Sequence, residues 1–416
     1  MQSQTAIIEP NSGSKVLHWT MVIIAMCCLL ISNGMVLTGL TAFDSAMLAE
    51  FSDWSRGDLK MRGLITLALT GLLAPFIGIL IDRIGVKVLM MFGAVVLGAS
   101  YYAYGMITDI SHMYYIHAAF AVVLVACGLN VAVILVSNWF VTMRGTAIGI
   151  AVMGTSLGGA ILAPLFGSWI SEGMSWRDAF QMASAIPAVL FLIALFLVKN
   201  RPADCNKKPM GYETLKDSSD ADVSSQGMEY IDAIKTKSFW AIALIAMFTF
   251  YTLLGLQANL VLHLQDLGFE IQSAAAGLAM LFTPALIGKF LFGLIADKVK
   301  GKRVLYGNLG LMLLGLIALY FAGKDTVLWT VAIIGFAWGG FYTLLQLNAV
   351  NNFGLKASGK LLGTITVLDA LGGGLGIFLT GKFFDMYGSY QNAFMVFIVL
   401  VVISLGLIGF IKKHVD

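Results

Sequence analysis

The chain has very little charge. Only 12% of its 416 residues are Asp, Glu, Lys or Arg, 59% are hydrophobic, and the mean hydropathy is +0.86. Soluble domains carry about 25% charged residues, and a chain of this length with so few cannot cover its exterior with polar groups. The composition therefore excludes a water-soluble fold and indicates a protein that lies in a lipid bilayer.

Cysteine is scarce as well, and no group of His, Cys, Asp and Glu has metal-site spacing. Three of the four cysteines lie in apolar runs and Cys205 lies in a polar loop, so we expect no disulfide framework. The sequence contains neither a nucleophile elbow nor a nucleotide-binding loop. We therefore expect no metal, no cofactor and no enzymatic activity. The net charge of +3 indicates basic cytoplasmic loops rather than affinity for nucleic acid.

Long apolar runs, in contrast, are frequent. About 20 helical residues cross the hydrocarbon of a bilayer, and runs of that length are predicted at 19–43, 60–81, 88–108, 113–137, 145–170, 178–198, 239–262, 274–296, 303–323, 327–351, 361–382 and 391–411. Residues 199–237 are too polar to span or to form a core, apart from one short helix near residues 230–234. The pattern predicts an all-α membrane protein with twelve transmembrane helices.

Basic residues set the expected orientation. Most lie in loops on the side of the two termini, which predicts that both termini are cytoplasmic. The opposite side is expected to keep only a few basic residues with many carboxylates among them, and these are Arg56, Lys60, Arg62, Arg177, Lys324 and Lys382. The short loops favour a bacterial inner membrane, and we expect a monomer.

The chain also repeats itself. Gly78-Ile-Leu-Ile-Asp82-Arg83 recurs as Gly293-Leu-Ile-Ala-Asp297-Lys298, and Leu157-Gly158-Gly159 recurs as Leu371-Gly372-Gly373, about 214 positions later in each case. Two halves of one ancestry predict pseudo-symmetric six-helix bundles with a site between them at mid-membrane. The expected parts are tails at 1–18 and 412–416, bundles at 19–198 and 238–411, and a cytoplasmic linker at 199–237.

The loop between the second and third runs resembles a known signature. Gly78-x-x-x-Asp82-Arg83-x-Gly85-x-Lys87 is similar to the loop motif of the major facilitator superfamily, and its degraded copy lies in the second half. The resemblance covers the whole chain and implies a secondary transporter with alternating access. It also implies a conformational switch, which we assign to Gly78, Asp82, Arg83, Gly85, Lys87, Arg144 and Asp297.

A narrower resemblance concerns the fourth and fifth runs. Asn138-Trp139-Phe140-x-x-x-Arg144-Gly145-x-Ala147-x-Gly149 is similar to the monocarboxylate-porter and oxalate/formate-antiporter group. In that group an arginine commonly lies four residues before the glycine of the second loop motif, where this chain has Lys289. Lysine keeps the charge but not the forked guanidinium. Oxalate-type relatives have a second cation in the eleventh span, where this chain has Asp369, which argues against oxalate-like substrates.

Lys289 is the first candidate for a functional residue, because an ammonium within a span costs roughly 2.5 kcal/mol or more. It could anchor a substrate, carry a proton, pair permanently with Asp369 or extend to the cytoplasmic surface. Asp369, about nine residues into its own span, is expected to take up a proton through desolvation. A Lys289–Asp369 pair that opens on protonation is our hypothesis for proton coupling, and a permanent lock between helices is the alternative.

Polar side chains in other runs could line the same cavity. In the family that the chain resembles, the first, fourth, seventh and tenth helices do so, and the candidates are Asn33, Thr38, Asn130, Tyr251, Gln257, Tyr342 and Gln346. Otherwise these groups bond between helices, at about 0.6 kcal/mol each. Gly154-x-x-x-Gly158 and residues 372–376 are interpreted as close helix packing. Pro164 lies six residues beyond Gly158, and the absence of a tight Gly-Pro pair favours uptake over efflux.

Together these patterns predict a carrier of a small organic anion, a monocarboxylate, by proton symport. One alternative keeps the fold and changes the cargo to a zwitterion or a heteroaromatic compound, taken up like a vitamin or exported like a drug. Another alternative is a transporter-shaped receptor that binds without carrying. The expected partners are the anion, protons and the lipid bilayer.

Overall fold

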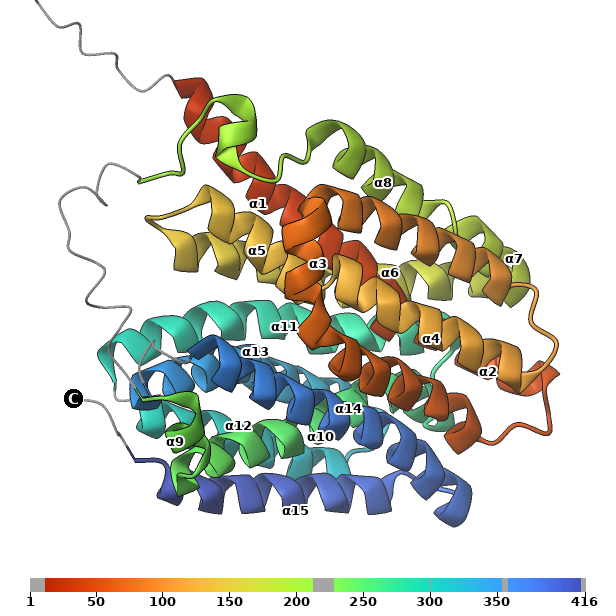
Figure 1. The fold of residues 1–416 in the computed structure, drawn as a ribbon. Helices are drawn as coiled ribbons and strands as arrows, with labels where there is room; N and C mark the ends of the chain where they lie inside the picture. Colours follow the sequence, from red (N-terminus) through yellow and green to blue (C-terminus); the bar gives the residue numbers. More distant parts are fainter. Residues whose placement is uncertain (1–11, 212–227, 300, 354–357, 413–416) are drawn as a thin grey trace, which may run out of the picture.

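The computed structural model describes residues 12–211, 228–299, 301–353 and 358–412. The helices before residue 206 and those after residue 228 form two groups that lie along each other (Figure 1). The first group contains α1 Ser12–Asn33, η1 Gly34–Thr38, η2 Gly39–Phe43, α2 Asp44–Glu50, α3 Arg56–Tyr104, α4 Ile110–Cys127, α5 Leu129–Trp139, α6 Arg144–Ser171, α7 Trp176–Ala183, α8 Ile186–Leu197 and η3 Pro202–Cys205.

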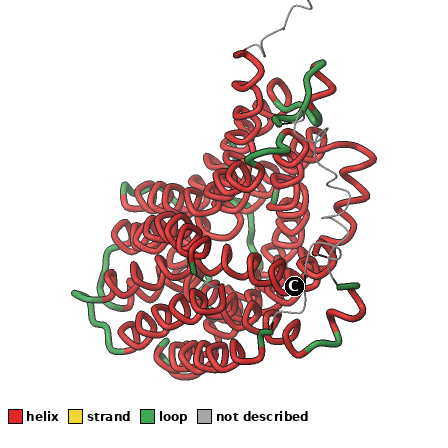
Figure 2. Tube along the Cα trace, turned by 90° about the vertical axis from the view of Figure 1, so that its left-hand side faces the viewer, coloured by secondary structure: helices red, strands yellow, loops and turns green. Residues whose placement is uncertain are grey.

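The second group contains α9 Tyr230–Ile234, α10 Lys237–Asp266, α11 Ile271–Lys298, α12 Gly301–Tyr320, α13 Val327–Phe353, α14 Ser358–Tyr387, α15 Gln391–Leu407 and η5 Ile408–Phe410. α9 coincides with the short helix predicted near residues 230–234. Figure 2 looks at the molecule from the side where α1 begins, and short loops join its helices. We call this side the terminal end, and the opposite side, where α3 begins, the Arg56 end.

The helices account for the predicted spans. Ten stretches among the described residues are long and apolar enough to cross a membrane. The other two predicted spans, 60–81 and 327–351, fall on the first half of α3 and on α13, and Val327–Phe341 of α13 is a shorter apolar stretch. The second and third spans follow each other within α3, where Gly85 alone departs from helical geometry, with φ of 80°. The all-α, two-bundle fold is thereby confirmed.

Each half has its own apolar core. One cluster of buried hydrophobic residues draws almost entirely on residues 21–198, and a second draws almost entirely on residues 233–411. Large apolar side chains also face outward, including Leu72, Phe196, Phe290, Phe321 and Trp329, which are 65–80% exposed. An exterior of this kind is stable in hydrocarbon and not in water. The molecule is an integral, multi-pass membrane protein.

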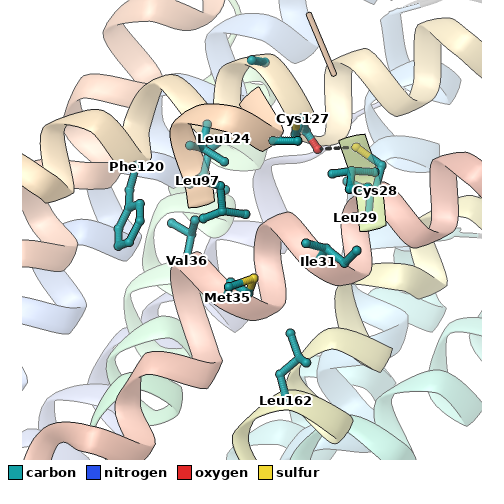
Figure 3. Packing of buried hydrophobic residues seen from close by; sticks show 14 of the residues in the cluster. Cys28, Leu29, Ile31, Met35, Val36, Leu97, Phe120, Leu124, Cys127 and Leu162 are labelled. Atoms are coloured by element: carbon teal, nitrogen blue, oxygen red, sulfur yellow. Dashed lines mark hydrogen bonds between the residues drawn. The ribbon is translucent and has the colours of Figure 1, made fainter. Parts of the chain in front are cut away.

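The first span is not a continuous α-helix. After Asn33 it passes through a π-helical turn and a 3₁₀ turn before α2 begins at Asp44. Figure 3 shows Met35 and Val36 of this irregular stretch lying among Leu97, Phe120 and Leu162 from neighbouring helices. Nearby, Cys28 donates through its thiol to the Cys127 carbonyl oxygen at 3.2 Å. Irregular turns inside spans frequently occur at functional sites.

Glycines bring α6 against α1, as predicted. A Cβ at Gly154 would lie 2.1 Å from the Met26 carbonyl oxygen, and a Cβ at Gly158 would lie 2.4 Å from that of Leu30. Gly372 and Gly376 of α14 approach the backbone of α10 in the same way. These stretches are therefore packing surfaces in which only a hydrogen fits between backbones.

Gly158→Ala tests this packing. Because the new methyl group would meet backbone atoms, which cannot rotate away, we expect a destabilisation of about 1–3 kcal/mol. The matched control is Gly149→Ala in the same helix, where nothing lies within 4 Å of the added Cβ. Thermal unfolding of both purified variants in detergent measures the difference. Equal melting temperatures would contradict the packing role of Gly158.

Candidate functional site

The two halves meet along two pairs of helices, α6 with α11 and α3 with α14. The contacts are close: a Cβ at Gly159 of α6 would lie 2.2 Å from the Phe282 ring, and a Cβ at Gly63 of α3 would lie 2.6 Å from Ile377. We call this contact surface the seam. A substrate that passes between the halves must cross it, so polar groups at the seam are the candidates for a site.

Charged groups join the halves at the Arg56 end. The Arg56 guanidinium donates to both carboxylate oxygens of Asp266, at 2.6 Å each, and to the Tyr390 hydroxyl at 2.9 Å. Its central carbon also lies 3.6 Å from the centre of the Phe384 ring. The Asp385 carboxylate accepts from the backbone N–H groups of Arg56 and Gly57, at 2.9 and 2.8 Å. An acid of one half thus caps the first helical turn of the other half.

Lys289 crosses the seam nearer the middle of the molecule. It lies on α11, and its ammonium donates to Ser156 Oγ at 2.8 Å, to Thr155 Oγ1 at 3.2 Å and to the Val152 carbonyl oxygen at 3.5 Å, all on α6. These three oxygens are neutral. They stabilise the Lys289 ammonium through their dipoles, and a dipole attracts a cation less strongly than a carboxylate does.

Asp369 lies on α14 with 8% of its surface exposed. Lys289 and Asp369 form no ion pair within the described part of the chain, since the contacts of Lys289 are with α6. In this conformation the predicted Lys289–Asp369 lock is therefore not formed. The coupling hypothesis needs the pair in another conformation, and it stays a prediction.

The other predicted lining residues differ in their surroundings. Thr38 is buried and donates to the Gly34 carbonyl oxygen at 3.0 Å, which closes the irregular turn of the first span. Asn33 is half-buried, Asn130 is exposed, and Tyr251 and Gln257 of α10 are buried at 9% and 3% exposure. The side chains of Tyr342 and Gln346 lie outside the described residues. Their roles stay predictions.

The loop motif contacts the start of the linker. At Gly85 the positive φ and the Asn200 amide leave no room for a side chain, since a Cβ would lie 2.6 Å from Asn200 Nδ2. Lys87 donates through its backbone N–H to Asn200 Oδ1 at 2.8 Å and through its ammonium to the Leu195 carbonyl oxygen at 2.6 Å. Arg144 donates to the Phe140 carbonyl oxygen at 2.8 Å.

Other members of the predicted switch stay untested. Arg83 is exposed, and the side chains of Gly78, Asp82 and Asp297 lie outside the described part. The contacts of Lys87 show which segment the motif holds, namely the end of α8 and the residues after it. Asn200 is therefore held against the first half.

Sequence reasoning placed Lys60 and Arg62 on the side opposite the termini but did not show that they are buried. They are 1% and 2% exposed, and both bond to the carboxylate of Asp44, which is 0% exposed. The reason is that α3 begins at Arg56, before the predicted span, so both side chains point from its first turns into the bundle. The sequence did contain a signal for this buried cluster. Two cations lie two residues apart at the start of one apolar run, and an acid directly follows the previous run.

Two helical halves in a bilayer, with polar groups bonded across the seam between them, have the architecture of the secondary transporters that the sequence resembles. A model of the Major Facilitator Superfamily matches residues 22–377, so the chain belongs to this superfamily.

Relatives within the superfamily are distant. The chain is 28% identical to bovine (Bos taurus) monocarboxylate transporter 13 over 269 residues, which are 62% of this chain and 58% of that protein. It is 24% identical to the oxalate:formate antiporter of Oxalobacter formigenes over 80% of this chain and 77% of that one. A bacterial homologue of the human lysosomal transporter Spinster has the same fold, with a TM-score of 0.72 at 16% identity over 96% of this chain and 97% of the other.

The Arg56–Asp266 contact predicts a measurable coupling between the halves. Single variants Arg56→Gln and Asp266→Asn are each expected to lower the melting temperature in detergent, and the double variant to lower it little further. A double-mutant cycle should give an interaction of about 1 kcal/mol, the upper range for partly exposed pairs. The control pair Lys235–Asp232, more than 60% exposed on both sides, should give no coupling. Additive effects of the two Arg56 and Asp266 variants would show that the pair does not hold the halves together.

Proposed function

We propose that the protein is a secondary active transporter of a small organic anion, a monocarboxylate, which it carries by proton symport with alternating access. The observation that carries the proposal is the ammonium of Lys289, which bonds across the seam to neutral oxygens of the other half. Among its described contacts this cation has no negatively charged partner, and the carboxylate of a substrate would supply one. The names of two relatives, a monocarboxylate transporter and an oxalate:formate antiporter, support this class of cargo.

The energetics favour exchange of partners at Lys289. Hydrogen bonds to a charged group contribute about 1.5–3 kcal/mol each, so Ser156 and Thr155 together offset the cost of roughly 2.5–3.5 kcal/mol for a charge within a span. A substrate carboxylate would replace these hydroxyls with an opposite charge. Because Lys289 and its present partners belong to different halves, binding of the anion and separation of the halves would be linked.

Asp369 is the proposed proton carrier. A buried carboxyl group without an ion pair in the described chain can gain and lose a proton as its surroundings change between conformations. In the proposed cycle the protonated carboxyl group accompanies the anion, and the proton leaves when Lys289 approaches in another conformation. Asn33, Thr38, Asn130, Tyr251, Gln257, Tyr342 and Gln346 are proposed to contact the rest of the cargo.

The proposed location is a bacterial inner membrane with the terminal end facing the cytoplasm, because basic residues concentrate in the loops of that end. Gly78, Asp82, Arg83, Gly85, Lys87, Arg144 and Asp297 are proposed to stabilise one conformation there. A chain with an acid, Asp369, and a cation, Lys289, inside its spans also suits a zwitterion or a heteroaromatic compound, so competition with amino acids and nucleobases belongs in the same assay.

Neutralisation of Lys289 tests the cargo. In proteoliposomes, Lys289→Met is expected to reduce uptake of radiolabelled lactate or acetate at least ~100-fold, because the anion would lose its proposed counter-charge, and partnering of buried charges is worth several kcal/mol. Lys289→Arg should retain measurable uptake, since the charge remains. Lys235→Met, which removes an exposed cation of the same half, is the matched control. Normal uptake by Lys289→Met, or competition by zwitterions but not by short carboxylates, would contradict the assignment.

Substitution of Asp369 tests the coupling. Asp369→Asn resembles a permanently protonated side chain, so uptake driven by an inward proton gradient should fall to the level seen without a gradient. Exchange of labelled for unlabelled lactate across the vesicle membrane needs no net proton movement and should continue. The protein with Asp369 serves as the reference in both assays. A response to the gradient that is equal in the two proteins would remove Asp369 from the proton pathway.

A further inference from the structure

A second cluster of charged groups lies at the seam, closer to the Arg56 end than Lys289. We call it the Asp44 cluster. Lys60 donates through its ammonium to the Asp44 carboxylate, and Arg62 donates through its guanidinium to the other oxygen of the same carboxylate. Arg62 also donates to the Tyr104 hydroxyl at 3.0 Å. All three charged side chains are at most 3% exposed.

The Asp44 cluster has one positive charge too many. Among the described residues, two cations share one carboxylate, and their other hydrogen-bond partners are neutral. Arg56, a further charged neighbour of Lys60, is itself paired with Asp266. The Tyr104 hydroxyl lies 3.2 Å from His117 Nε2, and Thr66 Oγ1 lies 2.8 Å from His117 Nδ1. Buried cations are normally balanced by acids, because a net charge in a low-dielectric interior is costly. In a structural ion pair the charges cancel. Here one positive charge is left without an acid and lies beside a cavity, which is the arrangement expected of an anion-binding site.

A cavity of about 20 Å³ lies beside these cations, with room for one water molecule. The first half lines it with groups from α3, from His117 and from the irregular stretch of the first span, and these are Lys60, Arg62, Gly63, Thr66, His117, Val36, Leu37, Leu40 and Thr41. Ala258 of α10 and Ile377 of α14 close it from the second half. The cavity is therefore bounded on one side by groups that belong to the other half of the molecule.

Ala258 lines the cavity, and its carbonyl oxygen also accepts a hydrogen bond from the Lys60 ammonium. This is the contact of the Asp44 cluster that crosses the seam. When the halves separate at the Arg56 end, Lys60 must lose this oxygen and Ile377 must move away from Gly63. The ammonium then has a free donor, the cavity widens towards that end, and the surplus charge is open to an anion.

We propose that Lys60 and Arg62 form a carboxylate-binding site that opens at the Arg56 end and that the Ala258 carbonyl oxygen occupies in the present conformation. The site is distinct from Lys289, which lies on α11 and bonds to α6. It rests on the proposed function for the identity of the anion, which would meet Lys60 first and Lys289 afterwards. The electrostatic part of the proposal concerns the Asp44 cluster alone.

Cysteine modification tests this site without any transport. Thr41, which lines the cavity and is 2% exposed, is replaced by Thr41→Cys in a chain whose own cysteines are changed by Cys27→Ser, Cys28→Ala, Cys127→Ala and Cys205→Ser. Two methanethiosulfonate reagents are compared on the purified protein, one with a sulfonate and one with a trimethylammonium group. In each reaction the cysteine thiolate attacks the reagent, a mixed disulfide forms, and methanesulfinate leaves.

The expected result is a preference for the anionic reagent. After division by the rates with 2-mercaptoethanol, the sulfonate reagent should react at least ~10 times faster than the cationic one, a ratio in the range of electrostatic focusing in clefts. Lys60→Met should bring the ratio close to one, and Lys60→Arg should restore it. Lys60→Met leaves Asp44 paired with Arg62, so this variant keeps a balanced pair and is expected to fold, which size-exclusion chromatography checks.

Lys382→Met is the matched control, because Lys382 lies at the same end and pairs with Asp58 outside the cavity. Its ratio should equal that of the parent. Equal rates for the two reagents, a ratio that Lys60→Met leaves unchanged, or no reaction with either reagent would each overturn the site. If the anionic preference is found but lactate and acetate are not transported, the cargo proposal fails and the anion site stands. If both carboxylates are transported without the preference, only the site fails.

Discussion

The structure depends on one constraint, which is that a charge buried in a bilayer protein needs its counter-groups inside the protein. Lys289 meets it with two hydroxyls and a carbonyl oxygen from the opposite half. Lys60 and Arg62 meet it by sharing Asp44, with help from the Ala258 carbonyl oxygen. In both places the stabilisation of a cation depends on how the two halves lie against each other, so a movement of the halves changes the partners of the charge.

The contacts along the seam differ in kind from one region to another. At the Arg56 end the halves are joined by ion pairs and by caps on helix ends, as in the contacts of Arg56 with Asp266 and Asp385. Along the helices they are joined by glycines such as Gly63 and Gly159, which allow backbones and rings to approach closely. Hydrogen bonds and ion pairs at the Arg56 end can be replaced by hydrogen bonds to water. Helix faces that pack through glycines have few side chains to rearrange when one helix moves along another. This combination suits a protein in which two rigid halves move relative to each other.

The sequence predicted those features of the fold that the lipid bilayer imposes on any chain. Apolar runs of spanning length, the repeat that relates Gly78 to Gly293, and the close packing at Gly154 and Gly158 were all visible, because hydrocarbon enforces helices and close packing requires small residues. The sequence also singled out Lys289, since one charge inside an apolar run has few explanations, and the role of Lys289 stays a prediction. It did not show that Lys60 and Arg62 are buried, because hydropathy cannot tell an exposed charge at the start of a span from one buried in the first turns of a helix.

The sequence by itself determined that this chain is a helical membrane protein with two related halves, and that it resembles the major facilitator superfamily, to which it belongs. The tertiary structure decided which charges meet. That Lys289 bonds to Ser156, 133 residues away, and that Lys60 bonds to Ala258, 198 residues away, depends on how helices of different halves pack. Local patterns carry information about one helix and its solvent, whereas partners across the seam are selected by the packing of the whole bundle.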